Sequence, residues 1–398
     1  MKFYKKVLNN GIVVIMEKRD TPVVSFSITN KFGAAFEESK IKGIAHFIEH
    51  LVFTGTKTRS HEDISREIEK KGGILNAFTS HEVTSFWFKL PSEHVFAGAD
   101  IIVDMLKNPL FDKEKFEKEK KVILEEIKMY HDNPRNAVSE QIEKNLYESP
   151  FGDLVIGNEK SIKSLDRDFV FNYYKKVYSP ENYVVCVVGD CDFDALCNYI
   201  DKNFVAGKRN LEIKKIVKKN AESFEEREGI DQAHLVFAVH APMPNEKEFN
   251  VLEVLDAYLA NGMSSRLFLE IREKRGLAYA VKSGMNSEKS YSYYSIYVGT
   301  TKKALDEVKK IIISEFKAIK DMKEEDLKEA KERVIGLKKV NSEEGSSVMN
   351  ELVFYELSGD AKDYYGYEKR INSVNLKEVK ELAVELIKSY SSAIIAPK

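Results

Sequence analysis

Two histidines and a glutamate stand within five residues near the start of this 398-residue chain, in the segment His46-Phe47-Ile48-Glu49-His50. At 100° per residue of helix, His50 lies about 40° and Glu49 about 60° to either side of His46, so all three share one face. Two neutral imidazoles one turn apart are good zinc ligands, and a neighbouring carboxylate that is not a ligand can take a proton from an attacking water molecule. The spacing predicts a hydrolytic metal site. The alternative is a helix with two surface histidines.

A catalytic zinc needs a third protein ligand, and residues 112–131 contain the candidates. Read as a helix, this segment has an apolar face, and Glu119 and Glu126, about 20° different in direction, fall in the middle of it. A carboxylate there is costly unless it is paired or bound to a metal, whereas Glu125 points away from the face. We therefore expect Glu126 as the third ligand and Glu119 as a supporting catalytic carboxylate. A pair of buried salt bridges is the alternative.

Further stretches, added to the H-x-x-E-H order and the two downstream glutamates, resemble the pitrilysin family of zinc metallopeptidases, the inverzincins. Residues 72–79 are similar to the strand that follows the family's zinc helix, and residues 178–182 with 187–190 to the closing strand of its first domain. Residues 264–267 and 272–279 resemble the signature of its second domain type. The match covers nearly the whole chain, which is identified as a half-length member similar to the subunits of mitochondrial processing peptidase.

The resemblance implies roles for four more residues. Asn76 and Ala77 would hold an extended peptide by adding it as a strand to the edge of a sheet. Arg272 and Tyr279 would contact the substrate and help to stabilise the tetrahedral intermediate. Without the resemblance, Arg272 reads equally as a surface charge on a helix, and Tyr279 as a core aromatic residue. The expected cofactor is one Zn²⁺ per chain, and the expected partner is a peptide substrate.

The composition is that of an ordinary globular protein, with 43% hydrophobic residues, 32% charged residues and a formal net charge of −2. Acidic and basic residues are interspersed, so nothing favours a nucleic acid or a membrane as partner. Cys186, Cys191 and Cys197 are odd in number and close together, which argues against a disulfide framework and favours small core residues. No apolar run has the length of a signal peptide or a membrane span, so we expect a cytoplasmic protein.

The predicted elements occur twice along the chain. The first half is predicted to contain strands at 11–16, 23–28, 84–90 and 184–188 and helices at 44–53, 60–71, 94–107 and 112–131. The second half repeats much of this order about 210 residues later, with strands at 235–239 and 291–298 and helices at 249–259, 264–275, 302–319 and 324–340. We therefore expect two α+β domains of one type, each a mostly antiparallel sheet with helices packed on one face.

The domain boundaries follow from this duplication. Residues 1–206 form the expected zinc-binding catalytic domain, and residues 207–221 form a linker without a periodic apolar pattern. Residues 222–398 form a duplicate that carries Arg272 and Tyr279. Residues 252–262, which take the place of the zinc helix in the repeat, contain no histidine, so this second domain is expected to be metal-free.

Together these features predict a zinc-dependent endopeptidase or oligopeptidase with Glu49 as general base. Full-length members of the family carry four such domains around a chamber. The half-length chain is therefore expected to form a homodimer in which zinc of one chain meets Arg272 and Tyr279 of the other. Two alternatives stay open, a non-catalytic scaffold like the core subunits of respiratory complexes and a processing peptidase subunit that needs a different partner chain. The complete metal-site residues argue against the scaffold, and the Arg/Tyr pair argues against the need for a different partner.

Overall fold

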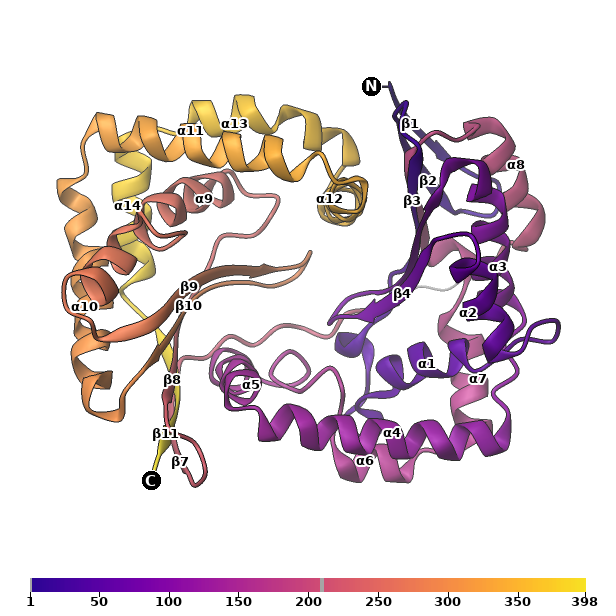
Figure 1. Cartoon of the computed structure of the whole chain (residues 1–398), viewed down its shortest axis with the longest axis horizontal. Coiled ribbons are helices and arrows are strands. Elements are labelled where there is room, and N and C mark those ends of the chain that lie inside the picture. The colour runs from indigo at the N-terminus through magenta and orange to yellow at the C-terminus, as the bar shows by residue number, and fades with distance from the viewer. Residues whose placement is uncertain (1, 208–210) are drawn as a thin grey trace. The chain divides into compact units, whose positions relative to one another are not determined.

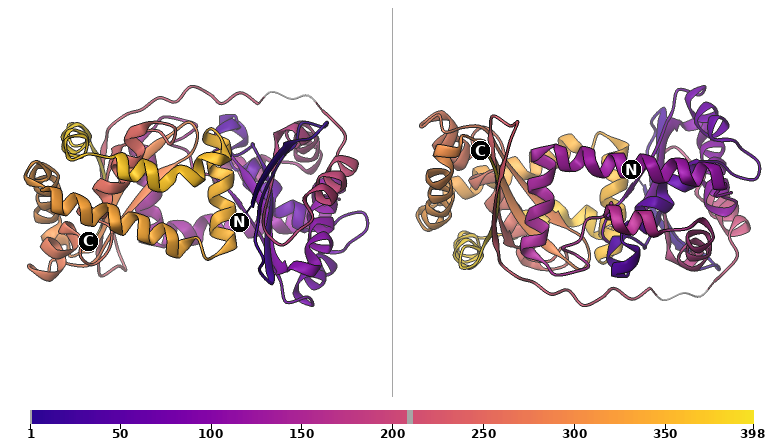
Figure 2. Two further views of the ribbon diagram at one scale, coloured as in Figure 1. Left: turned by 90° about the horizontal axis from the view of Figure 1, so that it is seen from above. Right: turned by 90° about the horizontal axis from the view of Figure 1, so that it is seen from below.

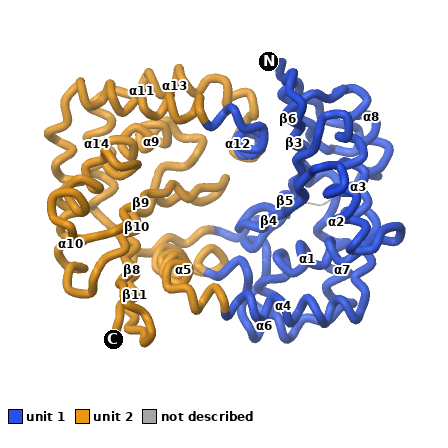
Figure 3. The backbone as a smooth tube through the Cα atoms, viewed as in Figure 1, with its two compact units in different colours: residues 1–128, 153–215, 341–356 blue, residues 129–152, 216–340, 357–398 orange. Residues whose placement is uncertain are grey.

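The computed structural model describes residues 2–207 and 211–398, which form two compact units, each built around one β-sheet (Figure 1 and Figure 3). Unit 1 comprises residues 1–128, 153–215 and 341–356, and unit 2 comprises residues 129–152, 216–340 and 357–398. Neither unit is continuous in sequence, so the chain passes repeatedly from one to the other.

The sheet of unit 1 consists of β1 (Lys2–Val7), β2 (Val13–Lys18), β3 (Val23–Asn30), β4 (Ile74–Thr79), β5 (Thr84–Pro91) and β6 (Tyr183–Gly189). The strand order is β1-β2-β6-β3-β5-β4, and only β2 and β6 run parallel. Side chains alternate along β3, so that Val24, Phe26 and Ile28 all enter the apolar core. The accompanying helices are α1 (Ile44–Phe53), α2 (His61–Glu69), α3 (Val95–Lys107), α4 (Lys113–Asp132), α6 (Glu159–Ser164), α7 (Arg167–Val177) and α8 (Phe193–Asn203).

The sheet of unit 2 consists of β7 (Glu222–Arg227), β8 (Ala233–His240), β9 (Ala278–Ser287), β10 (Ser292–Thr300) and β11 (Ser391–Pro397). Its order is β7-β11-β8-β10-β9, and only β7 and β11 run parallel. The accompanying helices are α9 (Lys247–Leu259), α10 (Leu305–Ala318), α11 (Glu324–Asn341), α13 (Tyr367–Ser373) and α14 (Leu376–Leu386). The predicted class, two α+β units with mostly antiparallel sheets, is confirmed.

Each unit also contains one helix from the other half of the chain. Helix α12 (Gly345–Ser358) belongs to unit 1 and lies on the face of its sheet opposite to α1 and α3; Figure 2 shows helices on both faces. Arg19 Nη1 donates to the carbonyl oxygen of Ser342 at 2.8 Å, and Lys89 pairs with Glu344 at 2.8 Å. Helix α5 (Pro134–Leu146) lies in the same way on the sheet of unit 2.

Small polar side chains line the face of the unit 1 sheet beneath α12. Ser25, Ser27 and Thr29 of β3 alternate with the apolar core residues, and each is 1% exposed. A Cβ atom added to Gly345 would lie 3.1 Å from Ser25 Oγ, so the helix begins in close contact with the strand. The prediction placed helices on one face of each sheet, and the exchanged helices add a cover on the second face.

The strongest local signals gave the most accurate element boundaries. The predicted helix at 44–53 coincides with α1. Helix α2 begins one residue after its predicted start with a capping box, in which Ser60 Oγ accepts from Asp63 N at 3.1 Å and Asp63 Oδ2 accepts from Ser60 N at 3.2 Å. The helix predicted at 264–275 is instead a short π-helix, η5 (Phe268–Glu273).

The predicted linker, residues 207–221, includes residues 208–210, which lie outside the described residues. The passage from unit 1 to unit 2 at residues 215–216 falls within this linker, and β7 begins directly after it. The residues that the structure describes contain no helix both long enough and apolar enough to cross a membrane.

Candidate metal centre

The N-terminus of α1 is held by a buried carboxylate. Gly43, with φ of 89°, precedes the helix and offers no side chain to cap it. Glu37 takes this role, because its two oxygens accept hydrogen bonds from the backbone N–H groups of Gly43 (2.9 Å) and Ala45 (2.7 Å). Glu37 is fully buried, and burial raises its pKa to about 7. His46 lies in the same first turn, so Glu37 fixes the start of the helix that presents this histidine.

His46, His50 and Glu126 meet between α1 and α4. One ligand atom of each lies within 4.8 Å of those of the other two, and no other such group of three occurs among the described residues. The Nε2 atoms of His46 and His50 lie 3.9 and 3.6 Å from Glu126 Oε2. Donor atoms around a tetrahedral zinc ion are about 3.3 Å apart, so this donor set and its spacing fit one zinc ion.

Burial is the largest single influence on the pKa of each member of this cluster. It lowers the pKa of His46 to about 3, with the nearby His50 as the smaller cause, so the imidazole of His46 is neutral and has a free lone pair. Burial raises the pKa of Glu126 against the opposing charge of His50. For His50, burial lowers the pKa, but the hydrogen bond with Glu119 and the charges of Glu126 and Glu49 outweigh it, so the pKa is raised overall.

Glu119 supports one of the two histidines from behind. Its Oε2 lies 3.3 Å from Nδ1 of His50, while Nε2 of the same ring faces Glu126. A carboxylate on the second ring nitrogen fixes the orientation of the ring and makes the first nitrogen a better ligand. The Nδ1 atom of His46 is buried and has no hydrogen-bond partner among the described residues. Glu119 therefore contacts the cluster through its hydrogen bond with His50.

Glu49 lies beside the cluster without belonging to it. Thr79, the last residue of β4, donates a hydrogen bond of 2.6 Å from Oγ1 to Glu49 Oε2. Burial raises the pKa of Glu49, and the hydrogen bond from Thr79 opposes this. The sequence prediction gave no role to Thr79 or to Glu37. Side-chain alternation from Ala77 would have indicated that Thr79 faces α1, whereas no local pattern indicates that Glu37 accepts from backbone groups of that helix.

Asn76 and Ala77 lie in β4, the edge strand of the unit 1 sheet. The backbone N–H of Ala77 donates to Asn76 Oδ1 at 2.8 Å, so this N–H has a side-chain acceptor rather than a neighbouring strand. Ile74 and Phe78, on the same side of the strand as Asn76, are 56% and 41% exposed. The predicted binding residues thus lie on an exposed strand edge next to Thr79.

Arg272 and Tyr279 lie in unit 2, whereas the metal cluster lies in unit 1. Arg272 is in η5, with its guanidinium 4.9 Å from the centroid of the Phe268 ring and 3.9 Å from Glu273. Tyr279 lies near the start of β9 and is 48% exposed. Both side chains are accessible, and their role in catalysis stays a prediction.

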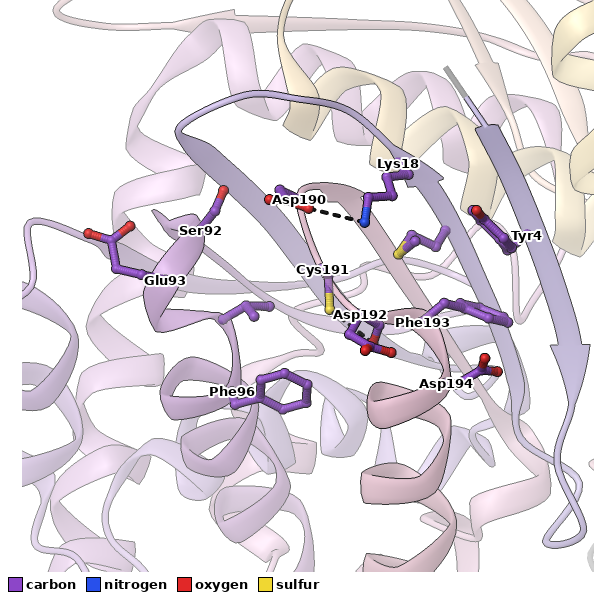
Figure 4. A pocket seen from close by; sticks show the side chains of 12 residues that line it. Tyr4, Lys18, Ser92, Glu93, Phe96, Asp190, Cys191, Asp192, Phe193 and Asp194 are labelled. Atoms are coloured by element: carbon purple, nitrogen blue, oxygen red, sulfur yellow. Dashed lines mark hydrogen bonds and ion pairs between the residues drawn. The ribbon is translucent and has the colours of Figure 1, made fainter.

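A separate hollow in unit 1 contains none of these residues. Its volume is ≈ 730 Å³, and it lies between the N-terminal ends of α3 and α8 and the strands β1 and β2 (Figure 4). Two of its four acidic residues have structural partners, because Asp190 pairs with Lys18 at 3.3 Å and Asp192 caps α8 by accepting from Ala195 N at 2.9 Å. The metal cluster, rather than this hollow, is therefore the candidate active site.

Comparisons with known proteins indicate the family of this chain. Residues 12–158 match the family described as insulinase (peptidase family M16), and residues 164–334 match the peptidase M16 inactive domain. A Bacillus subtilis protein described as an uncharacterized zinc protease is 31% identical over 98% of this chain and 97% of its own length.

Solved structures share the fold. A protease from Helicobacter pylori superimposes with a TM-score of 0.91 at 20% identity, over 100% of this chain and 99% of that one. A chain from the structure of Complex III2 from Candida albicans does so with a TM-score of 0.86 at 16% identity, over 99% of this chain and 95% of that one. The identity over the full length of the Bacillus subtilis relative decides the family: this chain belongs to peptidase family M16, the pitrilysin-type zinc proteases, as a half-length member.

Proposed function

We propose that this protein is a zinc-dependent endopeptidase or oligopeptidase that hydrolyses extended peptides or unfolded segments. The observation that carries the proposal is the cluster of His46, His50 and Glu126, with a further carboxylate, Glu49, held beside it by Thr79. Zinc proteases need both parts, since three ligands hold the ion and a carboxylate outside the ligand set moves the proton.

The metal site is proposed to hold one Zn²⁺ per chain through His46 Nε2, His50 Nε2 and Glu126 Oε2, with Glu119 orienting His50. When bound, zinc would polarise the scissile carbonyl group and lower the pKa of a water molecule. Glu49 acts as the general base. Thr79 occupies one oxygen of its carboxylate, which leaves the other to accept the proton of the attacking water and return it to the leaving amine.

The edge of β4 is the proposed site for the substrate backbone. Strand addition at Asn76 and Ala77 recognises main-chain groups, so it tolerates many sequences and requires an extended peptide. Ile74 and Phe78, exposed on the strand beside Asn76, favour substrates with apolar side chains at the neighbouring positions. Folded proteins offer no free backbone of this kind and are expected to be spared.

Arg272 and Tyr279 are proposed to contact the substrate and stabilise the tetrahedral intermediate, each supplied by the second chain of a homodimer.

We further propose that the protein works in the cytoplasm, since Cys186, Cys191 and Cys197 are buried thiols rather than disulfides. The alternatives are a non-catalytic scaffold, with which the fold shared with the Complex III2 chain is also compatible, and a peptidase that needs a different partner chain.

Glu49→Gln tests the proposed function directly. We expect purified wild-type protein to contain about one zinc per chain and to cleave members of a peptide library, with products read by mass spectrometry. The variant should keep its zinc and lose about 10³-fold in turnover, because the amide cannot accept the proton. Wild-type protein that holds zinc but cleaves no peptide would favour the scaffold. A variant with more than a few per cent of wild-type turnover would exclude Glu49 as the base.

A further inference from the structure

Tyr279 is the first member of a row of three polar side chains in unit 2. Its hydroxyl oxygen lies 3.5 Å from that of Tyr297, and Tyr297 Oη lies 2.8 Å from Nδ1 of His234. The three residues come from β9, β10 and β8, which are neighbours in the sheet. Tyr279 is 48% exposed and His234 is 8% exposed, so the row leads from the surface into the protein.

The structure around Gly299 explains how Tyr279 reaches this position. A Cβ atom at Gly299 would lie 2.4 Å from Cζ and from Oη of Tyr279, so the tip of the ring passes directly over this glycine. Gly299 pairs with His234 on β8, and the register between β10 and β9 shifts between Gly299 and Thr300. The missing side chain and the irregular register let the Tyr279 hydroxyl approach Tyr297 across the sheet surface.

Burial, together with two arginines, favours the uncharged form of His234 at the inner end of the row. The guanidinium of Arg135, from α5, lies 5.0 Å from the centroid of the Tyr297 ring. Burial lowers the pKa of His234, and the charges of Arg135 and Arg227 lower it further. A neutral imidazole carries one N–H group, so Nδ1 of His234 either donates to Tyr297 or accepts from it, and this choice sets the direction of every hydrogen in the row.

We propose that His234 and Tyr297 are positioning residues for Tyr279: Nδ1–H of His234 donates to Tyr297, Tyr297 donates to Tyr279, and the hydroxyl hydrogen of Tyr279 points outward to a substrate oxygen. The catalytic part of this inference rests on the proposed function, in which Tyr279 stabilises the negative oxygen of the intermediate. A hydroxyl has one hydrogen to donate. If Tyr279 donated inward to Tyr297, none would be left for the substrate, whereas a row that donates outward strengthens each successive donor.

The test is a double-mutant cycle on the full-length chain with a peptide substrate. Tyr279→Phe should lower kcat by about 10²-fold, as expected for loss of one donor to the intermediate. Tyr297→Phe should lower kcat by about tenfold and leave KM within about twofold, because the substrate still binds to an unchanged surface. In the Tyr279→Phe background, Tyr297→Phe should have no further effect. An equal loss in both backgrounds, or an unchanged kcat in Tyr297→Phe where Tyr279→Phe does lower kcat, would overturn the proposal.

Tyr293→Phe is the matched control. Tyr293 lies on the same strand as Tyr297, and its hydroxyl donates to Glu143 Oε1 of α5 at 2.9 Å. The variant loses a hydroxyl group and one hydrogen bond in the same part of the sheet without touching Tyr279. It should keep wild-type kcat, which separates positioning from a general loss of stability.

A spectroscopic measurement decides the positioning role without reference to activity. With 3-fluorotyrosine incorporated at position 279, the ¹⁹F resonance should move on Tyr297→Phe and stay in place on Tyr293→Phe. An unmoved resonance in Tyr297→Phe would overturn the positioning role. If the resonance moves as expected but Tyr279→Phe leaves kcat unchanged, the positioning stands, and it is the catalytic role of Tyr279 in the proposed function that fails.

Discussion

At the scale of single residues, the metal cluster was predictable where one short element carries the whole pattern. His46, Glu49 and His50 lie on one helix, so their common face follows from helix geometry alone. Glu126 could be chosen because a carboxylate on an apolar helix face needs a partner. Thr79 could be placed only by side-chain alternation along its own strand. Glu37 could not be assigned from any local pattern, because its contacts run to α1 from another part of the chain.

The choice of Glu126 over its neighbour is the first residue-scale prediction. Glu126→Ala should lose most of the zinc that wild-type protein holds, whereas Glu125→Ala should keep it. Glu125 is the matched control, because its side chain is 72% exposed and pairs with Lys128 at 2.8 Å. Metal analysis of both purified variants decides the matter. Full zinc content in Glu126→Ala together with loss of zinc in Glu125→Ala would show that Glu125, and not Glu126, is the third ligand.

The buried Glu37 predicts a pH dependence of stability. Its pKa in the folded protein, about 7, exceeds the ordinary value of 4.5, so the folded state holds this proton longer than the unfolded state. Stability from this group is therefore present at low pH and is lost as the pH rises through about 7. Glu37→Gln cannot ionise, so relative to it the wild type should lose about 2 kcal/mol of unfolding free energy between about pH 5 and about pH 8.

Urea unfolding of metal-free protein in the presence of a chelator measures this difference. Gln has one acceptor and one donor group where Glu has two acceptors, so one hydrogen bond to α1 is lost at every pH. That loss lowers the unfolding free energy of Glu37→Gln by the same amount at every pH, so it does not change the slope of the pH profile. Parallel pH profiles for the two proteins would mean that the carboxylate of Glu37 is ionised throughout this range.

At the scale of elements, prediction succeeded where the signals are local. The start of α2, where Ser60 and Asp63 form a capping box, was predicted to within one residue, and apolar periodicity predicted α1, α3 and α4. The exchanged helix α12 could not be placed, because Ser25, Ser27 and Thr29 alternate with apolar residues as a solvent-facing side would. A helix more than 300 residues later in the chain covers this face, and no local pattern indicates such a partner. The strands β1 and β7 were missed because charged residues dominate them.

The edge strand β4 carries the element-scale prediction. Ala77→Pro removes the N–H group that is bonded to Asn76 Oδ1 rather than to a neighbouring strand, so the sheet should tolerate the change. We expect kcat/KM for a peptide to fall at least about tenfold, because substrate backbone loses a donor, while zinc content stays unchanged. Ala77→Ser keeps the N–H group and a small side chain, and it should retain nearly full activity. Wild-type kcat/KM in Ala77→Pro would exclude strand addition at this residue.

At the scale of the whole molecule, the duplication was visible in the sequence but the interweaving of its halves was not. Repeated element order predicted two units of one type, and the structure has two sheets with one parallel pair each. The fold alone does not decide function, since a chain of Complex III2 from Candida albicans shares it at 16% identity. The cluster of His46, His50 and Glu126 is what favours a peptidase.

The last prediction concerns assembly. If each active site combines zinc of one chain with Arg272 of the other, then Glu49→Gln and Arg272→Ala chains, each inactive alone, should restore activity when mixed. Their heterodimer has one intact site, formed by the metal cluster of the Arg272→Ala chain and the arginine of the Glu49→Gln chain. When equal amounts of the two chains exchange at random, about half of the dimers are heterodimers, and one of the two sites in each heterodimer is intact. About a quarter of wild-type activity should therefore be recovered. The control is the Glu49→Gln chain mixed with a chain that carries both Glu49→Gln and Arg272→Ala, since every site then lacks its base. Heterodimers that form without recovering activity would mean that Arg272 and zinc act within one chain.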